Sequence, residues 1–249
     1  MEWKTAISHI EDGHELIRGY DLRELIAERS FPEVIYLVLR GELPGDKEMR
    51  MLNALFTAAV DHGVGVSSAM TARTVASTGN SMHTALAAGI LSMGTLHGSA
   101  IEDAARFFQT HVHARSVKAL VRGEQKAGRR LAGYGHKILR HDPRSDALFA
   151  VARETGLYGS HCRLAERILE ELNRDREHAL PLNVDGAMAA IASDMGFDWR
   201  MTKGLFIIGR TPGLVAHIFE EMTEGNGLRR LAEDESVYLG SPKRSITVP

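Results

Sequence analysis

The amino-acid sequence predicts an all-α protein, and three observations support this fold class. Apolar residues recur three and four positions apart along most of the chain, which is the spacing of one face of a helix. Runs of β-branched residues that alternate with polar residues, the pattern of a half-buried strand, are scarce. Short segments rich in Gly, Pro, Asn and Asp interrupt the helical spacing. We therefore expect a protein built from helices joined by turns.

The clearest helix is expected over residues 160–173, where one face is apolar and the other is charged. Leu164, Ile168 and Leu172 lie on the apolar face, opposite several Glu and Arg side chains. The same spacing predicts further helices at residues 21–40, 48–60, 66–78, 82–93, 99–110, 115–128, 145–155, 187–195, 199–209 and 212–223. The helix over 145–155 follows a DPR triplet, so we expect Asp142 as its N-cap and Pro143 at its first position.

Six breaks separate the helices, and several of them carry residues capable of acid-base chemistry. They are GELPGD (41–46), HGVG (62–65), GTLHG (94–98), GYGHK (133–137), LPLNVDG (180–186) and EGNG (224–227). Loops on a rigid helical frame are common places for reacting groups. Any one of His62, His97, His136 or Asp185 could be a structural cap. The four together indicate a functional site.

Composition is that of a soluble globular protein, with 44% hydrophobic and 25% charged residues over 249 positions. The net charge of −2 and the lack of a long basic run argue against nucleic acid as the main partner. The longest apolar stretch, at 85–93, is far shorter than the roughly 20 residues of a membrane helix. A single cysteine, Cys162, and an acidic start unlike a signal peptide predict a cytoplasmic location.

Sites of other kinds find little support in the sequence. His111 and His113 form an H-x-H without a second pair of ligands, so we expect a solvated helix end and no metal site. GEQKAGRR at 123–130 lacks the order of a phosphate-binding loop. No G-x-S-x-G is present, and Cys162 has no feature that would make it a thiolate, so covalent catalysis is not expected.

What remains is proton transfer by His and Asp, with arginines for carboxylates. Arg144, Arg210 and Arg230 are available, and a guanidinium binds a carboxylate through two parallel hydrogen bonds. If these arginines converge on one site, the substrate is a di- or tricarboxylate. The sequence alone does not place them together.

Six segments, in order, carry a family resemblance over nearly the whole chain. They are IRGYDLRELIAERSFPEVIYLVLRGELP (17–44), DHGVGVSSAMTAR (61–73), GTLHGSA (94–100), GYGHKILRHDPR (133–144), NVDG (183–186) and GLFIIGRTPGLVAHIFEE (204–221). With these the chain resembles the citrate synthase superfamily. The resemblance implies one citrate synthase-like helical unit over 1–249. It would consist of a large lobe at about 1–105 and 205–249 and a small, CoA-binding lobe at about 106–204.

The resemblance also implies catalytic roles. His97 resembles the histidine that holds the thioester oxygen, and His136 the one that hydrogen-bonds the oxaloacetate carbonyl. Asp185 is similar to the carboxylate that moves a proton at the acetyl carbon. His62 resembles an oxaloacetate-binding histidine.

Substrate-binding roles follow from the same resemblance. Arg144 and Arg210 are similar to two carboxylate-binding arginines. The third would be Arg230, which would reach the site of a neighbouring subunit, although adjacent Arg229 leaves that alignment ambiguous.

The resemblance places coenzyme A at the GYGHK loop. Gly133 and Gly135 belong to the segment that binds its adenine, with Lys137 and Arg140 near the phosphates. The thioester is a substrate, and no tightly bound cofactor is expected.

Two departures from citrate synthases narrow the expected activity. Only residues 45–60 lie between GELP and DHGVG, where citrate synthases insert a long helical stretch, and the spacing from GYGH to DPR is one residue shorter than usual. In the reduced length of its large lobe and in its NVDG segment, the chain looks most like citryl-CoA lyases, including the C-terminal lyase module of ATP-citrate lyase. That module lacks a histidine at the position of His97.

The expected reaction is cleavage of (3S)-citryl-CoA to acetyl-CoA and oxaloacetate by acid-base enolate chemistry. In the reverse direction, the same residues would catalyse the condensation reaction of citrate synthase. A catalytically silent subunit that binds CoA or a carboxylate is a third alternative, disfavoured by the intact His97, His136 and Asp185. Small residues along 66–93 suit close helix packing in a homodimer or higher homo-oligomer.

Overall fold

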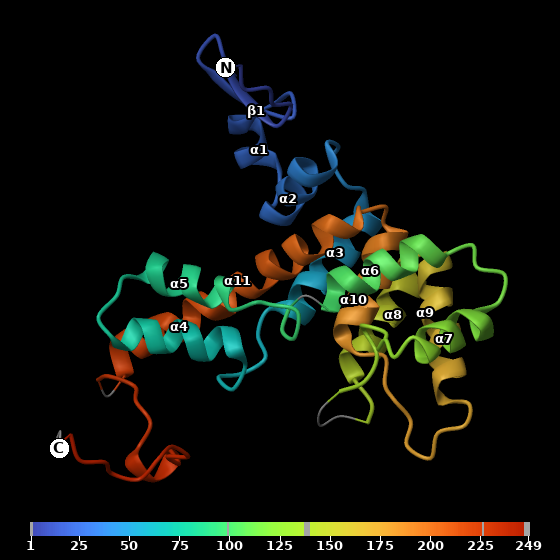
Figure 1. The fold of residues 1–249 in the computed structure, drawn as a ribbon. Helices are drawn as coiled ribbons and strands as arrows, with labels where there is room; N and C mark the ends of the chain where they lie inside the picture. Colours follow the sequence, from blue (N-terminus) through green and yellow to red (C-terminus); the bar gives the residue numbers. More distant parts are fainter. Residues whose placement is uncertain (1, 99, 137–139, 226, 247–249) are drawn as a thin grey trace.

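The computed structural model describes residues 2–98, 100–136, 140–225 and 227–246. Its strands are β1 (Ser8–Glu11), β2 (His14–Ile17) and β3 (Tyr20–Asp21). Its helices are α1 (Leu22–Glu28), α2 (Phe31–Arg40), α3 (Asp46–Ala59), α4 (Ser67–Ser77), α5 (Met82–Leu91), α6 (Ala100–His111), α7 (Val117–Lys126), α8 (Pro143–Thr155), α9 (Ser160–Asn173), α10 (Val184–Asp194), α11 (Trp199–Glu224) and the short 3₁₀ helix η1 (Glu233–Glu235). The all-α prediction is confirmed for the body of the molecule (Figure 1).

A small antiparallel sheet at the N-terminus is an addition that the sequence reasoning did not expect. Its strands follow one another in the order β1-β2-β3, with Ser8 opposite Ile17 in the first pair. Asp12 and Gly13 both have positive φ, 49° and 76°, which is the geometry of a two-residue hairpin turn that follows the strand twist. The sheet projects from the body beyond α1 and α2 (Figure 1).

At two places the number of helices differs from the prediction. Residues 21–40 form two helices, because the Ser30 and Glu33 capping box starts a new helix at Phe31. Conversely, the sequence predicted two helices at 199–209 and 212–223, but the structure has the single helix α11, which runs unbroken through Pro212. Pro212 is exposed, whereas the neighbouring Gly209 and Gly213 are buried against other segments. Tertiary packing therefore keeps the helix continuous.

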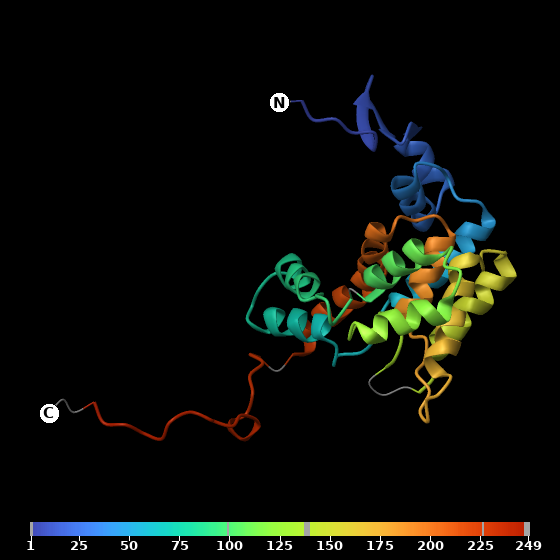
Figure 2. The same ribbon diagram turned by 45° about the vertical axis from the view of Figure 1, so that its right-hand side comes forward.

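Helix α10 lies at the centre of the body. Nine of its eleven residues are buried, many of them alanines, and it packs against α6, α8, α9 and α11. Helices α4 and α5 pair with each other and with α11 in an arm to one side (Figure 1). The C-terminal segment after α11 runs away from the body in both views (Figure 2). The division into a large and a small lobe stays a prediction.

Candidate active site

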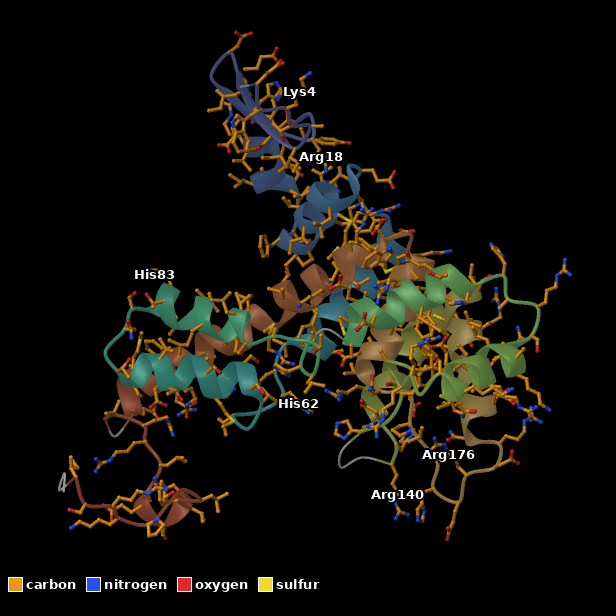
Figure 3. The ribbon with its side chains drawn as sticks, viewed as in Figure 1. Lys4, Arg18, His62, His83, Arg140 and Arg176 are labelled. Carbon is orange, nitrogen blue, oxygen red and sulfur yellow. The ribbon has the colours of Figure 1, made fainter. Side chains whose placement is uncertain are left out.

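One cavity of about 180 Å³ collects six of the residues that the sequence singled out. They come from five segments that are distant along the chain, and they are His62, His97, His136 with Arg144, Asp185 and Arg210. Figure 3 shows His62 between the arm of α4 and α5 and the rest of the body. The cavity therefore lies where the arm, α11 and the central helix meet.

The GYGH segment and the start of α10 are locked together by two glycines. Gly133 has φ +86°, and a Cβ there would lie 2.7 Å from the Gly186 Cα. Around this contact the Gly135 N–H donates to the Pro181 carbonyl (2.8 Å), and the Asn183 N–H donates to the Gly133 carbonyl (3.0 Å). The close approach places His136 beside the first turn of α10.

Asn183 completes this lock and fixes where α10 begins. Its side-chain oxygen accepts from the Gly186 N–H (3.1 Å) as N-cap, and its amide donates to the Gly135 carbonyl (2.9 Å). The helix consequently starts at Val184, three residues before the predicted start. Asp185 thus lies in the first helical turn, where the sequence reasoning had placed a loop.

Asp142 aligns Arg144 with the same helix end. It caps α8 as predicted, with Pro143 following, and it is only 1% exposed. Its two carboxylate oxygens accept from the Arg144 Nε and Nη2, both at 2.9 Å, and Oδ2 also accepts from the Val184 N–H (3.0 Å). Burial acts against its charge, but the hydrogen bonds and charge of Arg144 outweigh burial and hold the pKa of Asp142 below its ordinary value.

His62 faces the cationic side of the cavity. Its Nδ1 lies 3.3 Å from the Arg144 Nη1, and its ring meets the His136 ring edge-on with centroids 6.3 Å apart. Burial, followed by the charges of Arg144 and Arg210, lowers the pKa of His62. The imidazole is therefore neutral at pH 7 and ready to hydrogen-bond a substrate oxygen.

His97 lines the same cavity and contacts α4. Its Nε2 lies 2.9 Å from the hydroxyl of Ser68, which is fully buried on α4. Burial, followed by the charge of Arg210, lowers the pKa of His97. Because Ser68 engages one ring nitrogen, the other is left for a ligand.

Asp185 and Arg210 also line the cavity. Burial raises the pKa of the Asp185 carboxyl above its ordinary value, although Arg144 and Arg210 oppose this. Arg210 is 3% exposed, its Nε donates to the Ala59 carbonyl (2.6 Å), and its guanidinium lies over the Phe206 ring. Its Nη1 is buried and has no hydrogen-bond partner. A buried guanidinium nitrogen without a partner is suited to a carboxylate ligand.

Other predicted site residues lie apart from this cavity. Arg230 is exposed in the segment after α11 and does not line it. Adjacent Arg229 binds Glu221 of its own chain, with Nε 2.8 Å from the carboxylate, and its N–H donates to the Ser77 hydroxyl. Arg140 is exposed, and Lys137 lies outside the described residues.

A second cavity of about 730 Å³ shares His136 with the first. Gly135 also lines it, together with Arg129, Arg130 and Arg176. Figure 3 shows Arg140 and Arg176 on the same lower edge of the body. Sequence reasoning missed these three arginines, and the only local signal was the Arg-Arg pair at the end of a helix. The cavity is large enough for an extended anionic ligand.

Within the described ranges, no group of three His, Cys, Asp or Glu side chains could hold a metal ion. In the H-x-H of the sequence, the His111 Nδ1 lies 2.9 Å from the Phe107 carbonyl one turn earlier. None of the helices in the described part of the chain combines the length and the apolar character that a membrane span requires.

Comparison of the sequence and the fold with known proteins identifies the family of this chain. The sequence pattern described as citrate synthase, C-terminal domain, matches residues 2–51 and 45–232. The chain belongs to the citrate synthase family. Among solved structures, the citryl-CoA lyase from Hydrogenobacter thermophilus is 47% identical, with a TM-score of 0.94 over 98% of this chain and 97% of that one. The expected citrate synthase-like helical fold is thereby confirmed.

Curated citrate synthases are longer than this family member. Citrate synthase 2 of Bacillus subtilis is 27% identical over 97% of this chain and 63% of its own length. A citrate synthase 2 candidate from Mycobacterium tuberculosis is 31% identical over 83% of this chain and 55% of its own. The chain thus spans about half to two thirds of the length of these relatives. The Thermoplasma acidophilum citrate synthase, at 22% identity and a TM-score of 0.71 over 88% of this chain and 59% of that one, shares the fold.

Proposed function

We propose that this citrate synthase family member is a citryl-CoA lyase, which cleaves (3S)-citryl-CoA to acetyl-CoA and oxaloacetate. The observation that carries the proposal is the pair of cavities that meet at His136, because the substrate has a dicarboxylate citryl half and a CoA half. The likeness to the Hydrogenobacter thermophilus citryl-CoA lyase over nearly the full length of both chains supports the same activity.

The smaller cavity would hold the citryl group. Arg210 offers its buried Nη1 to one carboxylate, and Arg144, held by Asp142, faces another. His62, which is neutral, contributes a hydrogen bond beside them. Arg129, Arg130 and Arg176 in the larger cavity would bind the phosphates of CoA. A phosphate contact of Lys137 or Arg140 rests on the family resemblance alone.

Cleavage then requires one base, one oxyanion donor and one acid. His136 accepts the hydroxyl proton of citryl-CoA as the carbon-carbon bond breaks, and the bond electrons pass into the acetyl-CoA enolate. His97 donates a hydrogen bond to the thioester oxygen, where negative charge develops. Asp185 then gives its proton to the enolate carbon, a role favoured by its raised pKa.

The alternative activity is citrate synthesis, which uses the same residues in the other direction and adds hydrolysis of the thioester. The likeness to citrate synthase 2 of Bacillus subtilis over 97% of this chain favours this second candidate. A silent binding subunit is less favoured, because His97, His136 and Asp185 all line the cavity and a binding module has no need of the acid.

Two assays run side by side test the proposal. Oxaloacetate released from (3S)-citryl-CoA is followed by its reduction with malate dehydrogenase and NADH, and free thiol released from acetyl-CoA plus oxaloacetate is followed with a thiol reagent. The lyase forms oxaloacetate and releases no thiol. Rapid thiol release identifies a synthase, and binding of CoA without either reaction identifies a silent subunit.

We also propose that the protein works as a homodimer in the cytoplasm, with Arg230 completing the site of the second copy. The segment that carries Arg230 runs away from its own body and exposes apolar side chains, among them Leu231 and Tyr238 (Figure 2). Inactive Asp185→Asn and Arg230→Ala proteins, mixed under conditions of subunit exchange, should recover part of the activity, because one mixed dimer contains one intact site. Mixtures that stay inactive would exclude the shared site.

A further inference from the structure

A half-buried hydrogen bond joins Asp61, the residue before His62, to His217. The His217 Nε2 on α11 is 3.0 Å from the Asp61 Oδ1, and the two side chains are 13% and 38% exposed. Neither residue lines the cavity of the candidate active site. The pair therefore has no direct access to a ligand in that cavity, yet Asp61 is the immediate neighbour of His62 in the chain.

Helix α11 is shaped to receive the segment that leads to His62. Gly209, Gly213 and His217 follow one another at four-residue spacing, so they lie along one ridge of the helix. A Cβ on Gly209 would lie 2.9 Å from the Ala59 Cβ, and a Cβ on Gly213 would collide with the Val60 carbonyl oxygen. The end of α3 thus lies directly on the backbone of α11.

Two hydrogen bonds from α11 hold the segment from Ala59 to Asp61, one at each end of its contact with the helix. At one end the Arg210 Nε donates to the Ala59 carbonyl (2.6 Å), and at the other His217 binds Asp61. The second oxygen of Asp61 accepts from the Gly63 N–H (2.9 Å), which turns the chain around His62. The position of His62 relative to Arg210 therefore depends on Asp61.

Charge supports this arrangement. Burial acts against the Asp61 carboxylate, but hydrogen bonds from the Gly63 and His62 backbone and from His217 outweigh it and keep its pKa below the ordinary value. The ionised carboxylate also lies close enough to favour the charged form of Arg210, which burial opposes. Asp61 thus favours the charge of Arg210 in the cavity and holds the His217 ring through a hydrogen bond.

We propose that Asp61 and His217 are positioning residues that hold His62 at a fixed distance from Arg210, so that both contact the same substrate in one geometry. This inference rests on the proposed function for its substrate, the dicarboxylate half of citryl-CoA. The pair acts through His62 and takes no part in the proton transfers.

The test compares His217→Ala and His217→Gln with a matched control. Gln places an amide nitrogen near the position of the imidazole Nε2, so it can still donate to Asp61. The control is His161→Ala, which removes a similar His-carboxylate pair at α9, 2.8 Å from Asp194 and 18% and 6% exposed. The control shows what the loss of a histidine-carboxylate contact does by itself, so that any further effect of His217→Ala can be assigned to the changed position of His62.

We expect His217→Ala to weaken oxaloacetate binding about tenfold and to lower kcat/KM for citryl-CoA about 10- to 100-fold, the scale of a small misplacement of binding groups. His217→Gln should recover to within about threefold, and His161→Ala should bind as the wild type does. Equal oxaloacetate affinities in His217→Ala and the wild type, or equal losses in His161→Ala and His217→Ala, would overturn the inference.

A ligand-independent measurement distinguishes failure of this inference from failure of the proposed function. In protein labelled at its histidine rings, His217→Ala should move or broaden the His62 ring signals, assigned with a His62→Gln variant, whereas His161→Ala should not. A His62 signal that stays in place overturns the positioning role whatever the substrate is. A wild type that neither binds oxaloacetate nor cleaves citryl-CoA overturns the proposed function alone.

Discussion

Replacing Gly186 with alanine should destabilise the protein, although alanine is the better helix former. Gly186 lies in the first turn of α10, where helix propensity alone would favour alanine by about 1 kcal/mol. The new Cβ would lie 2.5 Å from the Gly133 carbonyl oxygen, 2.7 Å from the Leu182 Cδ1 and 3.0 Å from the Gly133 carbonyl carbon. Two of these three atoms are backbone and cannot rotate away.

The magnitude follows from the balance of these two effects. Overpacking by one methyl costs about 1–3 kcal/mol, and a backbone partner favours the upper part of this range. After subtracting the gain in helix propensity, we expect a net loss of about 1–2 kcal/mol. For a chain of this size that corresponds to a melting temperature lower by about 2–8 °C. Relief of the clash must also separate His136 from Asp185, so turnover should fall by about 100-fold.

The assay is thermal unfolding by circular dichroism together with the oxaloacetate-release assay. Gly123→Ala is the matched control, because Gly123 lies inside α7 and a Cβ there meets nothing within 4 Å. It should stabilise the protein by up to about 1 kcal/mol and leave turnover unchanged. A Gly186→Ala protein as stable and as active as Gly123→Ala would refute the role assigned to the glycine contact.

Three further substitutions test single groups. Asp185→Asn should reduce turnover by about two to four orders of magnitude. It should also raise the melting temperature at pH 7, because a raised pKa means that ionisation disfavours the folded state. That gain should shrink as the pH falls toward the ordinary value of 3.8, and a variant less stable than the wild type at pH 7 would contradict the raised pKa. Arg210→Leu should weaken oxaloacetate binding by roughly 2–4 kcal/mol in calorimetry, and unchanged affinity would remove it from the site. Burial acts against the charge of Asp194, but hydrogen bonds from the His161 ring and from the His161 and Cys162 N–H groups outweigh burial and hold the pKa of Asp194 below its ordinary value. The stability that the Asp194 carboxylate contributes is therefore present above the unfolded pKa and is lost as the pH falls through the depressed value. Asp194→Asn should lower the free energy of unfolding at pH 7 by about 2–4 kcal/mol, measured by denaturant unfolding. The folded variant should turn over substrate at the wild-type rate.

Local rules predicted most helices, because their amphipathic spacing and caps are encoded within a few residues. The helix expected at 160–173 has the same bounds in the structure, and Asp142 caps α8 as predicted. The hairpin at 8–17 was missed, although Asp12-Gly13 between two short runs is a hairpin signal. The break expected before Pro212 does not occur, because contacts with α3 override the local preference.

The candidate site was predictable only in part. Its four His and Asp residues were singled out by their places at breaks between helices, and the resemblance gave these residues and the two arginines their roles. Nothing in their spacing showed that they converge. Partners distant in the chain were missed: Ser68 is 29 positions from His97, and Asp61 is 156 positions from His217. The Arg144 Nη1 lies 82 positions from the His62 ring that it approaches. Pairs of this kind carry no local pattern, so only the folded chain reveals them.

The unbroken course of α11 has a consequence for how the length of this chain can vary. Each residue of a helix turns its successor by about 100°, so one inserted residue between Gly209 and Glu221 would rotate every later side chain off its partner. Gly213 would leave the Val60 carbonyl, His217 would leave Asp61, and Glu221 would leave its arginines. Exposed loops such as residues 78–81, between α4 and α5, have no such constraint. Natural variants of this protein should therefore gain and lose residues in the loops, while the number of residues between Gly209 and Glu221 stays constant.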